Sequence, residues 1–229
     1  MKAVFLDRNT LSERIDVDIP KGVVQWVAFQ KTAPDEIVQR LKPADIAIVN
    51  KVKLDESILR QLPNLKLIHL TATGMDNIDK EAAKALGIEV KNVAGYSTES
   101  VTEHFFLLLL SAMRALKTYH ASVGDGTWQK DGRFCLTEPP VHGKTLGIIG
   151  VGNIGKAISK VAEVFGMKVL WAERQGKAPR SKEYTEFNKV LAQSDIISLN
   201  CPLTPETKHL VDEEFISKLR KKPLLINMA

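Results

Sequence analysis

Three glycines in the second half of the chain have the spacing of a phosphate-binding turn. Gly150, Gly152 and Gly155 form the pattern G-x-G-x-x-G between the strand-like run TLGIIG and the helix-like run KAISKVAEVFG. Glycines at these positions permit a tight turn, a close approach of the backbone to a pyrophosphate, and close packing of the helix on the strand. The N–H groups at the helix start, around Asn153 and Ile154, would face the phosphates. The pattern therefore predicts a dinucleotide site.

The acidic residue that ends the next strand-like run predicts which dinucleotide binds. Glu173 closes the run MKVLWAE. A carboxylate there can accept hydrogen bonds from both hydroxyls of the adenine ribose and would repel a 2′-phosphate, so we expect NAD. Arg174 follows directly, and a guanidinium beside the ribose could accommodate NADP, which leaves that cofactor open. The alternative interpretation is an ordinary strand–turn–helix unit with a surface glutamate.

Strand-like and helix-like segments alternate along the chain, which is the arrangement that places such a turn at a sheet edge. Strands are expected at 2–7, 23–29, 45–50, 65–73, 88–93, 145–150, 167–173, 195–200 and 223–229, and helices at 34–41, 55–62, 79–87, 156–166, 185–193 and 212–219. Asp55 is the expected N-cap of the second helix. The alternation predicts an α/β fold with parallel sheets covered by helices on both faces.

One segment departs from this rhythm. Residues 97–122 read as a single long helix whose middle, HFFLLLLSAM, is almost continuously apolar. A helix that is apolar all round is a buried one, so we expect it between two domains or at a subunit interface. Residues 124–143 are rich in glycine, proline and charge and are expected to be irregular. The domain boundary is placed before the long helix, which gives domains 1–96 and 97–229.

Composition excludes several classes of function. The net charge of +5 comes from cations scattered among acids, and no basic stripe interleaved with aromatics indicates a nucleic-acid partner. The apolar runs are too short to span a bilayer or to serve as a signal peptide, so no membrane association is expected. Cys135 and Cys201 lie far apart, without CxxC or clustered histidines, which argues against a metal site and a disulfide framework. A reducing compartment, the cytoplasm, is the expected location.

Five motifs together carry a resemblance to a known family. They are TATGMDNID (71–79), NVAGYSTESVTEH (92–104), GIIGVGNIGKAI (147–158), SDIISLNCPLTPETKHLV (194–211) and LLINMA (224–229). In this order, and over nearly the whole chain, the sequence resembles the D-isomer-specific 2-hydroxyacid dehydrogenases, and in particular their glycerate dehydrogenase or hydroxypyruvate reductase branch.

The resemblance implies a fold and an activity. Residues 1–96 would form a flavodoxin-like substrate domain. Residues 97–229 would form a Rossmann-type dinucleotide-binding domain that begins with an interdomain and dimerisation helix and lacks the family's last strands. The implied activity is hydride transfer between NAD(H) and a small D-2-hydroxy acid or 2-oxo acid, with glycerate, hydroxypyruvate and glyoxylate first among substrates. A homodimer is implied as well.

The resemblance also implies roles for individual residues. The backbone N–H groups around Gly74 and Met75 would hold the substrate carboxylate, and Asn50 and Lys51 would line the same cleft. The chain would cross between domains at Tyr96 and Ser97. The positions that match cofactor contacts of the family, in addition to the glycine motif, Glu173 and Arg174, are Thr102, Cys201, Pro202, Thr207 and Ala229.

Two features depart from the family pattern. Asn200 stands where many members have histidine, and we assign it no chemistry. The family follows N-x-A with an arginine that binds the substrate carboxylate, and later with a glutamate that orients a proton-transferring histidine. In this chain Ala229 is the last residue. The resemblance therefore predicts that the catalytic arginine, glutamate and histidine lie beyond Ala229, and that residues 1–229 alone are inactive.

Other functions remain open at the level of sequence. Another member of the class, such as a phosphoglycerate or D-lactate dehydrogenase, would carry the same motifs. From a different class, a non-catalytic NAD-binding regulatory protein on this scaffold would show dinucleotide binding without turnover. An inactive fragment would show neither dinucleotide binding nor cooperative melting.

Overall fold

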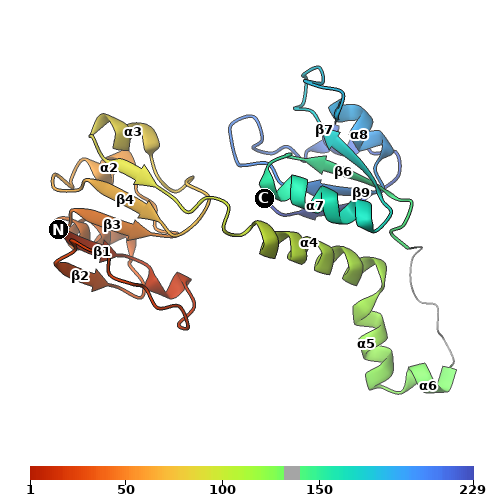
Figure 1. The fold of residues 1–229 in the computed structure, drawn as a ribbon, viewed down its shortest axis with the longest axis horizontal. Helices are drawn as coiled ribbons and strands as arrows, with labels where there is room; N and C mark the ends of the chain where they lie inside the picture. Colours follow the sequence, from red (N-terminus) through yellow and green to blue (C-terminus); the bar gives the residue numbers. More distant parts are fainter. Residues whose placement is uncertain (132–139) are drawn as a thin grey trace. The chain divides into compact units, whose positions relative to one another are not determined.

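The computed structural model describes residues 1–131 and 140–229. These residues form two compact units, Met1–Tyr96 and Ser97–Ala229. Each unit contains a five-stranded sheet in which every pairing is parallel. The α/β fold with two parallel sheets that the sequence predicts is thereby confirmed (Figure 1). Cys135 and part of the expected irregular segment 124–143 lie outside the described residues.

The first unit has the strand order β2-β1-β3-β4-β5, which is the flavodoxin-like order. Its strands are β1 (Lys2–Phe5), β2 (Gln25–Ala28), β3 (Ile46–Val49), β4 (Leu67–Leu70) and β5 (Glu89–Lys91). Residues alternate between the two sheet faces, so Val4 belongs to a different buried cluster from Ala3 and Phe5.

The helices of the first unit are short. They are the 3₁₀ turns η1 (Arg8–Thr10) and η2 (Pro34–Glu36) and the helices α1 (Ile37–Leu41), α2 (Glu56–Leu59) and α3 (Lys80–Ala85). Asp55 caps α2 as expected, because its carboxylate accepts the N–H of Ile58. The buried residues of α1, α2 and α3 all join the larger cluster on one sheet face. The smaller cluster on the other face is packed by Leu11, Val23 and Trp26, so the expected helical cover on both faces is wrong for this unit.

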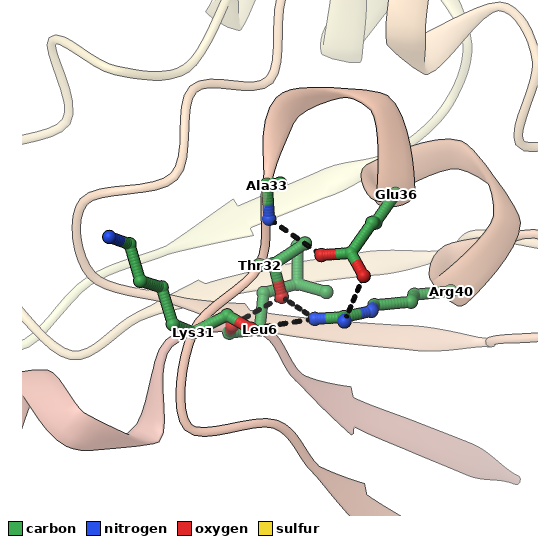
Figure 2. A network of polar contacts seen from close by, with 6 residues as sticks. All are labelled: Leu6, Lys31, Thr32, Ala33, Glu36 and Arg40. Carbon is green, nitrogen blue, oxygen red and sulfur yellow. Dashed lines mark hydrogen bonds and ion pairs between the residues drawn. The ribbon is translucent and has the colours of Figure 1, made fainter.

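A hydrogen-bond network fixes the loop that follows β2. The buried hydroxyl of Thr32 donates to the carbonyl of Leu6 at 2.5 Å. The guanidinium of Arg40 donates to Thr32 Oγ1 and to Glu36 Oε1, both at 2.6 Å. Glu36 Oε2 accepts the N–H of Ala33 at 2.8 Å. Figure 2 shows how these groups converge, and they tie the start of α1 to the end of β1.

The second unit has the strand order β10-β9-β6-β7-β8. Its strands are β6 (Thr145–Ile149), β7 (Lys168–Ala172), β8 (Tyr184–Thr185), β9 (Ile196–Leu199) and β10 (Leu224–Asn227), and its helices include α4 (Thr98–Met113), α7 (Asn153–Val164), α8 (Phe187–Gln193) and α9 (Glu213–Ser217). Buried residues of α4 and α7 share one cluster with β6, and those of α8 and α9 share another. Helices therefore cover both faces of this sheet, and the short strand β8 lies where we expected a polar loop and the start of α8.

The expected single helix over 97–122 is wrong. Helix α4 ends at Met113, and α5 (Leu116–Gly124) begins after Ala115, whose φ of 48° is left-handed (Figure 1). Alanine has the highest helix propensity of all residues, and no glycine or proline marks this break. The sequence therefore carries no sign that the helix would end here.

Helix α4 is also not buried all round. Phe105 and Leu109 are fully buried, whereas Leu107 is 56% and Leu108 40% exposed. A third helix, α6 (Thr127–Asp131), occupies part of the segment expected to be irregular.

Candidate functional site: a dinucleotide cradle and an anion-binding edge

The strand order of the second unit creates a crevice beside the glycine motif. After β6 the chain continues outward to β7 and β8, and then returns to place β9 on the opposite side of β6. The connections after β6 and β9 therefore lead to opposite sides of the sheet. In open parallel sheets, ligands bind at such a reversal point, outside the carboxyl ends of the strands. Gly150 follows β6 at this edge, and Cys201 follows β9.

Gly150 makes the turn that brings these two segments together. Its φ of +92° is a conformation that side chains rarely adopt. A Cβ on Gly150 would lie 2.4 Å from the backbone nitrogen of Cys201 and 2.5 Å from the carbonyl carbon of Asn200. No side chain fits between these backbones, so the structure requires glycine at this position.

The two remaining glycines of the motif differ in their surroundings. A Cβ on Gly155 would lie 2.5 Å from the carbonyl oxygen of Gly150, because helix α7 packs closely on the turn. A Cβ on Gly152 would meet no protein atom within 4 Å. Gly152 is the N-cap of the twelve-residue helix α7. Open space therefore lies at a helix start where the first N–H groups have no partner within the helix.

Asn153 and Ile154 form the first turn of α7. Asn153 is exposed, while Ile154 is half-buried and packs against the cluster that α4 and α7 share. The backbone N–H groups of this turn begin the helix directly after Gly152, where a Cβ would meet no protein atom. An anion placed there would meet backbone donors and the positive end of the helix dipole.

Glu173 directly follows β7, which pairs with the strand before this turn. Ile148 of β6 pairs with Trp171 of β7, so Gly150 and Glu173 each follow that pair by two residues. The carboxylate is 3% exposed. Arg180 donates to it from its guanidinium (2.8 Å from Nε to Oε2, with a second bond from Nη2 to Oε1) and from its backbone N–H, and Arg174 donates from its own backbone N–H. The bonds from Arg180 and Arg174 lower the pKa of Glu173 to about 2.

Arg174 uses only its backbone on Glu173. Its side chain is exposed, and its positive charge contributes to a lowered pKa of Glu206. The first cause of that shift is a hydrogen bond from the Thr204 side chain. Arg174 therefore lies within electrostatic reach of the loop that follows β9.

That loop contains three of the expected cofactor contacts, Cys201, Pro202 and Thr207. Thr207 Oγ1 donates to the carbonyl of Pro202 at 2.5 Å and accepts the N–H of Thr204 at 2.8 Å. Its hydroxyl therefore stabilises the loop itself. Cys201 is half-buried at the loop start, and burial raises the pKa of its thiol, which stays neutral at neutral pH.

Thr102 and Ala229 lie on other elements of the same unit. Thr102 is buried in α4, where its hydroxyl donates to the carbonyl of Thr98 at 2.7 Å. The N–H of Ala229 donates to Asn227 Oδ1 at 3.0 Å, just after β10. No hydrogen bond in the described structure joins either residue to the glycine turn.

One polar atom near the turn has no protein partner. Asn200 Oδ1 is buried and accepts no hydrogen bond within the described residues, while its Nδ2 donates to Ser198 Oγ at 2.9 Å. A buried acceptor without a donor is destabilising unless a ligand or water supplies one. The open space at Gly152, the buried carboxylate of Glu173 and this acceptor together fit a dinucleotide.

In the first unit, the expected substrate residues Asn50 and Lys51 are arranged around a buried carboxylate. Asp7 follows β1 and is 4% exposed. It accepts the backbone N–H groups of Asn50 (2.9 Å), Lys51 (2.6 Å) and Val52 (3.1 Å). This sheet also reverses direction between β1 and β3, so Asp7 anchors the loop that emerges there.

A cavity of about 550 Å³ lies at this edge. Asp7 and Lys51 line it, together with Asn9, Thr10, Lys31, Thr32, Pro34, Ile37, Val52, Lys53, Asp55 and Ile58. Three lysines border the cavity, and the carboxylates of Asp7 and Asp55 are occupied by backbone N–H groups. The charges at the cavity edge therefore favour the binding of an anion.

Gly74 and Met75 follow β4. Asn77 connects their loop to the one after β3, because its Nδ2 donates to the carbonyls of Asn50 (3.3 Å) and Val52 (2.8 Å). Gly74 is exposed, whereas the Met75 side chain packs against the main core of the unit. Of this pair, the backbone is the part that remains available to a ligand.

Three residues that organise these sites were missed from the sequence. Asp7 carried one signal, a lone acid closing the apolar run KAVFLD, and Asn77 carried none beyond its place in TATGMDNID. Arg180 lies seven residues beyond Glu173 in a polar loop, and no spacing rule indicates that it would return to the carboxylate.

Within the described residues, no three histidine, cysteine, aspartate or glutamate side chains are grouped so as to hold a metal ion. No helix in residues 1–131 and 140–229 is both long and apolar enough to cross a membrane.

Comparison with known proteins matches both units. Residues 106–229 match the profile of the D-isomer specific 2-hydroxyacid dehydrogenase, NAD binding domain. The chain is 42% identical over 233 residues to the glycerate dehydrogenase of Methylorubrum extorquens, covering 100% of this chain and 72% of that protein. It is 32% identical over 237 residues to the hydroxypyruvate reductase of Blautia hydrogenotrophica, covering 99% and 74%.

A solved structure shows the same architecture. The D-lactate dehydrogenase of Aquifex aeolicus, in complex with NAD and lactic acid, superposes with a TM-score of 0.81 at 31% identity, covering 99% of this chain and 68% of that one. The profile spans more than half of the chain, and the relatives exceed 30% identity over most of their length. The chain belongs to the D-isomer-specific 2-hydroxyacid dehydrogenase family, whose members are NAD-linked oxidoreductases.

Proposed function

We propose that this protein reduces a small 2-oxo acid, or oxidises the matching D-2-hydroxy acid, with glycerate, hydroxypyruvate and glyoxylate as the first candidates. The observation that carries the proposal is the cradle at Gly150, Gly152 and Gly155, where a glycine with no protein neighbour caps a helix beside a buried carboxylate. The named relatives act on glycerate and hydroxypyruvate, and a further relative from Aeropyrum pernix is a glyoxylate reductase.

The second unit, residues 97–229, is the proposed NAD-binding domain. Backbone N–H groups of Asn153 and Ile154 would face the pyrophosphate, and Glu173 would hold the adenine ribose. The positions assigned to the rest of the dinucleotide are Thr102, Arg174, Cys201, Pro202, Thr207 and Ala229. The nicotinamide of bound NAD supplies or accepts the hydride. The neutral thiol of Cys201 suits a packing role rather than a nucleophilic one.

The first unit, residues 1–96, is the proposed substrate domain. A 2-oxo acid carries a carboxylate, and the loops after β3 and β4 offer the Lys51 ammonium and the backbone around Gly74 and Met75. The amide of Asn77 supports this assignment, because it joins the loop of Asn50 to the loop of Gly74. Asp7 would act as a positioning residue that fixes the backbone of Asn50 and Lys51.

A homodimer in the cytoplasm is part of the proposal. Helix α4 exposes Leu107 and Leu108, and α5 exposes Leu116. Leu108 and Leu116 line one hollow, and exposed apolar surface of this kind is typical of protein interfaces. The family resemblance assigns this helix to dimerisation, and the exposed leucines support that assignment.

The proposal is tested by incubating the purified full-length protein with NADH and a panel of 2-oxo acids. Consumption of NADH with hydroxypyruvate or glyoxylate, at a higher kcat/KM than with pyruvate, is the expected result. Preference for pyruvate would move the substrate assignment towards a lactate dehydrogenase. NADH binding without turnover of any 2-oxo acid would contradict the enzyme proposal and favour a regulatory NAD-binding protein.

A further inference from the structure

The carboxylate of Glu173 has no free acceptor position in this structure. An ionised carboxylate has about four lone-pair sites. Oε1 accepts the N–H of Arg174 and a bond from Arg180 Nη2, while Oε2 accepts the N–H and Nε of Arg180 at 2.9 and 2.8 Å. A ribose whose two hydroxyls donate to Glu173 must therefore displace the Arg180 guanidinium.

Arg180 is held in place by more than the ion pair. Its guanidinium carbon lies 4.5 Å from the centre of the Tyr184 ring. That ring packs edge-to-face on Trp171, whose indole N–H donates to Ser159 Oγ at 2.8 Å. The guanidinium therefore packs on a ring of β8, which is itself held by residues of β7 and α7. Its side chain is nevertheless 49% exposed, so one side of the guanidinium faces solvent.

The surrounding loop is positively charged. Between Glu173 and β8 the chain carries four cations, Arg174, Lys177, Arg180 and Lys182, and one acid, Glu183. The single carboxylate that should repel a phosphate here is already neutralised by one of these cations. The electrostatic argument for strict NAD selection by Glu173 therefore does not hold for this loop.

We propose that Arg180 makes the adenine-ribose site accept NADP as well as NAD, by leaving the Glu173 carboxylate to the ribose hydroxyls when the ribose is unmodified and by pairing with the 2′-phosphate when one is present. The inference rests on the proposed dinucleotide site. A guanidinium has five donors in a planar fork and can bridge a carboxylate and a phosphate at once. With NAD, the ribose hydroxyls take acceptor positions from the fork, and Arg180 remains stacked on Tyr184.

The test measures the dissociation constants of NADH and NADPH by quenching of protein fluorescence in the full-length protein. The wild-type protein should bind both. In Arg180→Ala the ratio of the NADPH constant to the NADH constant should rise about tenfold or more, because the 2′-phosphate loses a charged partner and meets a bare carboxylate. Arg180→Gln, which keeps a hydrogen-bond donor without charge, should shift the ratio in the same direction.

Two further variants make the test specific. Lys182→Ala removes one cation from the same loop without a contact to Glu173, and should leave the ratio unchanged. Glu173→Gln should lower the ratio, because it weakens the ribose contact and removes the negative charge. An unchanged ratio in both Arg180 variants would overturn the inference, as would loss of NADPH binding in Arg174→Ala alone.

Failure of the inference is distinguishable from failure of the proposed function. A wild-type protein that binds neither dinucleotide would contradict the site itself. A wild-type protein that binds NADH tightly and NADPH not at all would leave the site standing and overturn only the role of Arg180. If Arg180→Ala weakened the binding of NADH and NADPH equally, Arg180 would have a purely structural role, and the inference would also be overturned.

Discussion

Asp7 fixes the loop that would meet a substrate carboxylate in the first unit. Its buried carboxylate accepts three consecutive backbone N–H groups, those of Asn50, Lys51 and Val52. A carboxylate in this place offsets the free-energy cost of burying the backbone N–H groups, and it also fixes the backbone of Lys51. A single acid at the end of an apolar run indicated a strand end, but the sequence does not say which loop the acid would bind.

Replacing Asp7 with asparagine should therefore destabilise the protein. The amide keeps one acceptor oxygen but presents an NH₂ group to backbone donors, so the free energy of unfolding should fall by about 1–3 kcal/mol. Urea denaturation measures the change. Asp35→Asn, at an exposed position, is the control. An equal fall in the free energy of unfolding for both substitutions would show that the Asp7 hydrogen bonds do not stabilise the fold.

Glu173 should give stability a specific pH dependence. Its pKa in the folded protein is about 2, below the ordinary value of 4.5, chiefly because of the Arg180 guanidinium. A lowered carboxylate pKa stabilises the fold fully above the unfolded pKa, and the contribution is lost as pH falls through the folded pKa. Wild type should lose more stability than Glu173→Gln between about pH 4.5 and pH 2. Parallel melting-temperature profiles of the two proteins over this range would contradict the assigned ion pair.

At the scale of elements, the glycine turn and helix α7 follow from the sequence almost completely. The pattern predicts a tight turn, an open approach and a close helix contact. Gly150 has a positive φ, a Cβ on Gly152 would meet no protein atom within 4 Å, and a Cβ on Gly155 would lie 2.5 Å from the carbonyl oxygen of Gly150. Local spacing sufficed because each requirement is met within one strand–turn–helix unit.

Elements that depend on distant packing were less predictable. The break at Ala115 has no glycine or proline, and a left-handed alanine is stabilised only by its context. Strand β8 is two residues long and exists because Tyr184 and Thr185 pair with β7. Arg180 reaches Glu173 through that pairing, so the sequence could not place it in the site.

Gly155→Val and Gly152→Val should separate folding from ligand binding. A side chain at 155 collides with the carbonyl of Gly150 and should lower the free energy of unfolding by about 1–3 kcal/mol. A side chain at 152 meets no protein atom, so the melting temperature should stay close to wild type. Differential scanning calorimetry compares the two. A Gly152→Val protein that melts as early as Gly155→Val would contradict the described packing.

At the scale of the whole molecule, the described residues form two units, each with a parallel sheet whose strand order reverses direction beside a candidate site. The α/β fold with parallel sheets, the family and the NAD-linked activity were all predicted from the sequence and are confirmed. The motifs identify the family because they combine five local patterns in one order. They do not fix the substrate, because no distance or side-chain placement can be read from them.

Oligomeric state is the prediction that belongs to this scale. If the exposed leucines of α4 form a subunit interface, analytical ultracentrifugation should give twice the chain mass for wild type, and Leu108→Glu should shift the protein to a monomer. Val164→Glu is the matched control, because Val164 is an apolar residue at the end of α7 that is 87% exposed. A wild-type protein that sediments as a monomer would contradict the dimer.

The central claim is that the second unit binds a dinucleotide at Gly152, the open glycine that caps helix α7, and titration of NADH into wild type and Gly152→Val tests it most directly. The account predicts saturable binding to wild type and a dissociation constant at least about tenfold weaker in the variant, because a side chain would occupy the space of the phosphates. Equal NADH affinity in the two folded proteins would place the dinucleotide elsewhere and contradict the account.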